Sequence, residues 1–74
     1  MESPIKVDPE IMHGTPCFAG TRVPVEALFD YLEDGRTTAF FLEQYPSVTM
    51  EQVQAVLRMA RDIIPAPATR RAAG

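Results

Sequence analysis

Hydrophobic residues recur at helical spacing in a segment that begins just after Pro24. The apolar positions follow the i, i+3, i+4, i+7 pattern of one helix face and are Val25, Leu28, Phe29 and Leu32. Proline is favoured in the first turn of a helix, where a missing N–H leaves no hydrogen bond unmade. Gly35 follows the last apolar position and is typical of a left-handed C-terminal cap. The pattern therefore predicts a first helix between Pro24 and Gly35.

A short second helix is predicted next. Thr37 or Thr38 can cap its N-terminus with a side-chain hydroxyl. Pro46 ends it, because the residue before a proline is disfavoured in helical conformation. Its apolar positions are Phe41, Leu42 and Tyr45.

The third predicted helix is the longest, at roughly 22 Å for a rise of about 1.5 Å per residue. Thr49 and Gln52 have the spacing of a capping box, in which the hydroxyl and the glutamine side chain each bind a backbone N–H of the other residue. Its buried stripe is predicted to contain Val53, Val56, Leu57, Ala60 and Ile64.

The segment before these helices alternates between apolar and polar residues and is rich in turn formers. Residues 5–7 alternate and stop at Asp8-Pro9, which predicts a short strand and a turn. Residues 16–18 and 21–23 flank Ala19-Gly20, which is typical of a tight hairpin. We therefore predict a single mainly α domain over residues 1–64, with a β element before three helices. Residues 65–74, PAPATRRAAG, are predicted to form a disordered tail.

Size and charge favour a protein partner. A chain of 74 residues buries only about 60% of its unfolded surface, so support from a dimer or another protein is expected. The net charge is −3 and the pI is about 4.9, whereas a stand-alone nucleic-acid binder carries a basic surface. No membrane-spanning segment or secretory signal is predicted. One cysteine fits a reducing cytoplasm.

A third helix that follows a short helix and turn matches a helix-turn-helix motif, in which that helix enters the major groove. Glutamine can bind adenine and arginine can bind guanine or phosphate, whereas Glu51 would repel phosphate. This helix is therefore either a recognition helix or an ordinary solvated face. Its outward residues are predicted to be Glu51, Gln52, Gln54, Ala55, Arg58, Arg61 and Asp62.

Few other residues suggest a site. Phe40 lies beside Phe41 on a short helix, so it either forms part of an interface or is half-covered by the N-terminal strand. His13 and Cys17 have no further histidine or cysteine to complete a metal set. The chain is too short for a sizeable pocket, so we predict no enzymatic activity, no metal and no cofactor.

Several motifs together resemble one bacterial family, domain-of-unknown-function family 433. They are Gly14-x-Pro16, the stretch Gly20-Thr21-Arg22-Val23-Pro24-Val25, Gly35 followed by a threonine, Tyr45-Pro46, and a helix that begins after Thr49. The similarity covers about residues 5–64. It implies a three-helix, homeodomain-like helix-turn-helix bundle with a small β element in front. It also implies an antitoxin-like role beside a PIN-like nuclease toxin.

The chain departs from the family pattern at three positions. Thr15 and Ala19 stand where the family usually has basic residues, which weakens the basic patch near the hairpin. Phe40 stands where the family tends to have a glutamate that would complete a capping box with Thr37. The exchange exposes apolar surface and favours a protein contact.

Arg22 has two interpretations. It either pairs with Glu26 or Glu33, or it contacts a phosphate or an acidic partner surface. The residues predicted to bind DNA are Thr21, Arg22, Gln52, Gln54, Arg58 and Arg61, and those predicted to bind a protein partner are Phe40, Arg70 and Arg71.

The expected function is that of an antitoxin in a type II toxin–antitoxin pair. It would bind a basic PIN-like nuclease toxin and, as a homodimer, operator DNA. The alternative is a stand-alone transcriptional regulator, and a structural interaction module is the third possibility.

Overall fold

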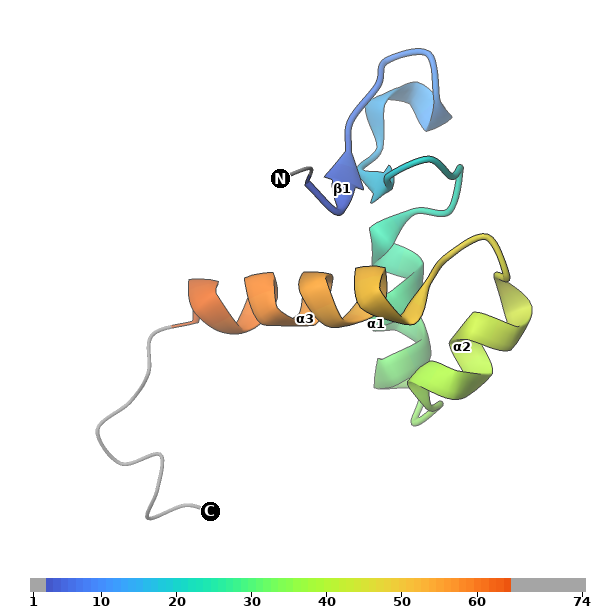
Figure 1. The fold of residues 1–74 in the computed structure, drawn as a ribbon, viewed down its shortest axis with the longest axis vertical. Helices are drawn as coiled ribbons and strands as arrows, with labels where there is room; N and C mark the ends of the chain where they lie inside the picture. Colours follow the sequence, from blue (N-terminus) through green and yellow to red (C-terminus); the bar gives the residue numbers. More distant parts are fainter. Residues whose placement is uncertain (1–2, 65–74) are drawn as a thin grey trace.

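The computed structural model describes residues 3–64, which form a small β element followed by three helices (Figure 1). Strands β1 (Ile5–Lys6) and β2 (Cys17–Phe18) pair antiparallel, with Ile5 opposite Phe18. The 3-10 turn η1 (Met12–Gly14) lies between them, and its backbone φ angles are all positive, from 53° to 86°. The predicted first strand is confirmed, and its partner is β2.

The predicted turn at Ala19-Gly20 is present, but it does not join two regular strands. The Phe18 N–H donates to the Val23 carbonyl at 3.0 Å, and the returning chain forms one isolated bridge, between Cys17 and Pro24. The expectation of a hairpin with two strands around this turn is therefore wrong in part. Pro24 has no N–H to extend a ladder, and helix α1 starts at the next residue.

The helices are α1 (Val25–Glu33), α2 (Thr38–Gln44) and α3 (Met50–Ile63). Gly35 ends α1 with φ +84°, and the N–H groups of Gly35 and Arg36 donate to the carbonyls of Leu32 and Tyr31. These two bonds form a Schellman motif. The predicted mainly α fold of three helices behind a short antiparallel β element is confirmed.

The caps of α2 and α3 also form as predicted. The Thr37 hydroxyl accepts from the Phe40 N–H at 3.0 Å. Thr49 and Gln52 form the complete capping box, with bonds of 3.1 Å and 3.0 Å. Each box or cap satisfies backbone N–H groups that a helix leaves unpaired at its start.

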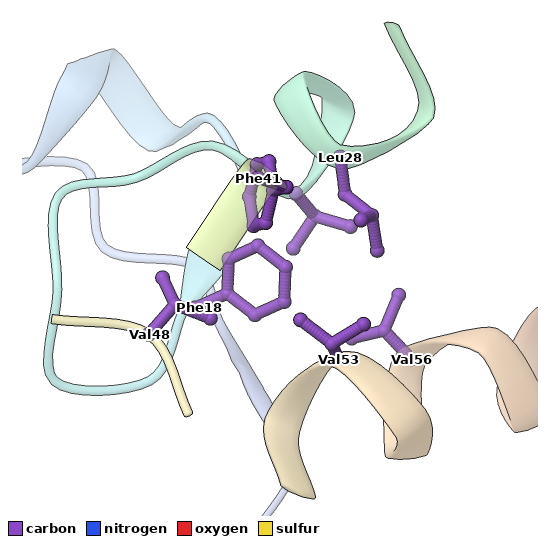
Figure 2. Packing of buried hydrophobic residues seen from close by; sticks show 7 residues of the cluster. Phe18, Leu28, Phe41, Val48, Val53 and Val56 are labelled. Atoms are coloured by element: carbon purple, nitrogen blue, oxygen red, sulfur yellow. The ribbon is translucent and has the colours of Figure 1, made fainter. Parts of the chain in front are cut away.

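Every main element contributes to one core (Figure 2). Phe18 of β2, Leu28 of α1, Phe41 of α2 and Val53 of α3 are fully buried and point toward one another. The remaining buried members of the cluster are Val25, Val48 and Val56. Because the strand residue Phe18 packs among residues from all three helices, the β element is part of the core.

The predicted buried stripe of α3 is wrong at its C-terminal end. Val53 and Val56 are buried and Leu57 and Ala60 are half-buried, but Ile64 is 65% exposed. The C-terminal half of α3 extends past α1 and away from the other elements (Figure 1). No helix in residues 3–64 has the length and apolar character to cross a membrane. The predicted tail, with Arg70 and Arg71, lies outside the described residues.

Candidate functional site

The turn after β2 holds Arg22 at a defined position. The Thr21 hydroxyl donates to the Phe18 carbonyl at 2.8 Å and accepts from the Val23 N–H at 3.0 Å. Gly20 has φ +79°, a backbone conformation that residues other than glycine rarely adopt. Thr21 therefore serves to fix the residues on both sides of Arg22, which accounts for the Gly-Thr-Arg motif in structural terms.

The Arg22 side chain is exposed. Among residues 3–64, no carboxylate lies within 4.0 Å of its guanidinium, so the predicted pairing with Glu26 or Glu33 is not formed. The second interpretation of Arg22, contact with a phosphate or an acidic partner surface, therefore stays a prediction.

Arg22 is one of the residues that line an open hollow of about 560 Å³. Lys6 of β1 is the second cation there, and no aspartate or glutamate of the described residues lines the hollow. Its apolar lining includes Ile11, Val23 and Pro24. The lining of the hollow is therefore positively charged and partly apolar, although the chain as a whole has a net charge of −3.

Gln52 is engaged within the domain. Its Oε1 completes the capping box with Thr49, and its Nε2 donates to the Ala19 carbonyl at 2.9 Å. An adenine contact would have to compete with both bonds. The structure therefore gives Gln52 a local role, in tying the start of α3 to the turn that carries Arg22.

The other predicted DNA-binding residues of α3 are exposed. Gln54, Arg58 and Arg61 border a shallow depression together with Leu57. Arg61 is 3.9 Å from the Asp62 carboxylate, and both side chains are more than 70% exposed. Such exposed pairs contribute little to stability. Glu51 and Asp62 are also exposed on α3, so the two arginines of this surface are matched by two acidic residues.

Phe40 is half-buried, but the N-terminal strand is not what covers it. The ring centroid of Phe40 lies 5.9 Å from that of Tyr31. The guanidinium carbon of Arg36 lies 5.1 Å from the same Phe40 centroid. Tyr31 also contacts Phe41 and Tyr45 edge-on. Phe40 is therefore the outer member of an aromatic cluster between α1 and α2, and part of its ring remains open to a partner.

The surroundings of Tyr31 in this cluster alter its ionisation. Hydrogen bonding to Tyr45 is the main cause that raises the pKa of Tyr31 above its ordinary value of 10.0. Desolvation and the Tyr45 charge act in the same direction, and the Arg36 charge opposes them.

His13 and Cys17 differ in their surroundings. Cys17 is buried, and its thiol donates to the Thr15 carbonyl at 3.3 Å. His13 is exposed in the η1 turn. Within residues 3–64 there is no cluster of three or more histidine, cysteine, aspartate or glutamate residues that could hold a metal ion.

The sequence patterns did not predict that the C-terminal end of α3 is an exposed apolar surface. The exposed fractions of Met59, Ile63 and Ile64 are 41%, 81% and 65%. We call these three residues the α3 end. The apolar stripe of α3 is longer than the part of this helix that packs against the rest of the domain. Helical periodicity alone does not show where that packing ends.

The chain is similar to one known family. The family model described as "Protein of unknown function (DUF433)" matches residues 5–60, and the chain belongs to this family. The matched segment runs from β1 to Ala60 of α3 and includes the turn with Arg22. Neither the curated proteins nor the solved structures gave a match to the chain.

Proposed function

We propose that this member of the DUF433 family is the antitoxin-like component of a type II toxin–antitoxin pair. It binds and neutralises a PIN-like nuclease toxin. The observation that carries the protein-binding part of this proposal is the exposed α3 end. The nuclease identity of the partner comes from the resemblance of the sequence motifs to antitoxin-like proteins.

The apolar side chains of the α3 end are exposed in the isolated domain, so their burial against a partner would stabilise a complex. Among residues 3–64, Ile63 is the most exposed large apolar side chain, at 81%. Burial of one isoleucine contributes about 1.5–3 kcal/mol relative to leaving it in water. Ile63 and Ile64 together can therefore support a stable contact with an apolar surface of another protein.

The charge of the chain also fits a protein partner. Several exposed carboxylates lie on or just after α1, on the opposite side from its buried residues Val25 and Leu28. They are Glu26, Asp30, Glu33 and Asp34. This surface complements a basic protein, and complementary charge speeds encounter and selects the partner. The same carboxylates repel the phosphates of DNA.

Co-purification tests the proposal. The chain is expressed together with the product of the neighbouring gene, one of the two is tagged, and the eluate is assayed for nuclease activity. The expected result is a stoichiometric complex without activity, from which an active nuclease is recovered when the two chains are separated in denaturant. A neighbouring protein that elutes alone, or that stays active in the complex, would contradict the proposed function.

Operator binding is a second candidate, because Gln54, Arg58 and Arg61 are exposed on the helix that follows the α2–α3 connection. In this mode a homodimer places two copies of α3 on a palindromic site, with or without a toxin partner. Affinity for the operator then falls steeply with salt. Arg58→Ala should weaken retardation of operator DNA, and unchanged retardation would exclude α3 as the DNA-contacting helix.

A further inference from the structure

The hollow beside Arg22 combines positive charge with apolar contact area. Lys6 and Arg22 provide two positive charges, and no carboxylate of residues 3–64 lies in its lining. Ile11, Val23 and Tyr45 provide apolar contact area. An occupant that suits both features carries negative charge and also has apolar atoms.

Arg22 is held ready for such an occupant. The two hydrogen bonds of the Thr21 hydroxyl fix the backbone before and after it. The bond from Gln52 to Ala19 ties the same turn to α3. An arginine on a fixed backbone loses less conformational freedom on binding than one on a flexible loop. Its guanidinium can bind a carboxylate with two parallel hydrogen bonds.

We propose that this hollow binds an acidic segment of the partner protein, with a carboxylate between Lys6 and Arg22 and an apolar side chain against Val23. The proposal rests on the proposed function, because it assigns a site to the same partner. It concerns a different surface from the α3 end, since none of the residues of that end lines the hollow.

A peptide segment fits the hollow better than the phosphates of DNA do. A DNA duplex is a long polyanion, so it meets the acidic remainder of this chain, whose net charge is −3, as well as the two cations. A short acidic peptide segment interacts only with the positive charges of the hollow, Lys6 and Arg22. It also uses the apolar lining, from which a phosphate group gains nothing.

The test measures affinity of the full chain for the purified neighbouring-gene product by calorimetry. Arg22→Glu and Lys6→Glu reverse the two charges of the hollow. Glu43→Lys is the matched control, because it reverses one charge at an exposed position of α2 outside the hollow. Thermal unfolding of each variant verifies folding. Chemical shifts of the labelled chain on addition of the partner provide a readout that needs no substitution.

The expected result is that Arg22→Glu and Lys6→Glu each weaken the complex roughly tenfold or more, whereas Glu43→Lys changes it less than about threefold. Amide shifts at Lys6, Arg22 and Val23 should accompany binding. Wild-type affinity in both hollow variants, with no shifts there, would overturn this inference and leave the proposed function intact.

Two other outcomes assign the hollow differently. Loss of operator binding in Arg22→Glu, with normal partner affinity, would identify phosphate as its ligand and overturn the inference. A change in the sedimentation of the lone protein on the same substitution would identify a second copy as the occupant, with the same consequence. Failure of the wild-type chain to bind the neighbouring product would instead contradict the proposed function, and the inference falls with it.

Discussion

The side-chain amide of Gln52 joins the start of α3 to the turn after β2, because its Nε2 donates to the Ala19 carbonyl at 2.9 Å. The two residues are 33 positions apart in the chain. The same side chain closes the capping box with Thr49. One residue therefore begins the longest helix and also fixes that helix against the segment that carries Arg22.

Gln52→Ala should lower the free energy of unfolding by about 1–2 kcal/mol, because both the cap and the tie to Ala19 are lost. Urea denaturation measures this effect. Gln54→Ala, at an exposed position on the same helix, should change stability by less than about 0.5 kcal/mol. Equal effects of the two substitutions would show that the bonds of Gln52 are not stabilising.

The Thr21 hydroxyl should be needed for folding stability. Thr21→Val keeps the shape but removes one donor and one acceptor, leaving the Val23 N–H and the Phe18 carbonyl without these partners. A loss of about 1–3 kcal/mol is expected, whereas Thr21→Ser should retain most of the stability. Thermal unfolding of the two variants checks this, and a Thr21→Val protein as stable as Thr21→Ser would contradict the structural role.

The α3 end should matter for binding and not for folding. The double substitution Ile63→Ser and Ile64→Ser should leave the unfolding free energy within about 0.5 kcal/mol of wild type, because both side chains are exposed. It should weaken the complex with the neighbouring-gene product roughly tenfold or more. Val53→Ala, at a fully buried position of the same helix, should cost about 2 kcal/mol of folding stability.

Calorimetry and urea denaturation together separate these effects. A double variant that binds as tightly as wild type would remove the observation on which the protein-binding proposal depends. A double variant that unfolds at lower urea would show that these isoleucines stabilise the domain itself.

Alkaline pH should destabilise the domain through Tyr31. Its pKa is raised above 10.0 in the folded state, mainly through the hydrogen bond with Tyr45. A raised folded-state pKa favours the protonated form, so the associated stability is present below pH 10 and is lost as pH rises through the higher folded value. Titration of tyrosinate absorbance measures that pKa.

Tyr45→Phe is the matching control for this titration. It removes both the hydrogen bond and the charge that Tyr45 contributes, so the pKa of Tyr31 should move down toward its ordinary value. An unchanged titration of Tyr31 in this variant would exclude Tyr45 as the cause.

Local patterns in the sequence predicted the helices, because each signal acts within a few residues. The glycine at position 35, the threonine hydroxyls before α2 and α3, and Pro46 all act on adjacent backbone, so their effects follow from spacing alone. The same holds for the tight turn at Ala19-Gly20. The predicted surface residues Gln54, Arg58 and Arg61 are exposed for the same reason, since helical periodicity decides which side faces away from the core.

Tertiary contacts decided the rest. Helical periodicity placed Ile64 with Val53, but only the length of the elements packed against α3 determines how far along the helix burial extends. By sequence alone, Thr21, Arg22 and Gln52 are all candidates for binding a ligand. In the folded chain, Thr21 and Gln52 form hydrogen bonds within the domain, whereas Arg22 is exposed at the hollow that Lys6 also lines. The chain itself thus determined its helices and caps through local backbone chemistry. Three-dimensional packing alone determined which side chains remain available to a partner.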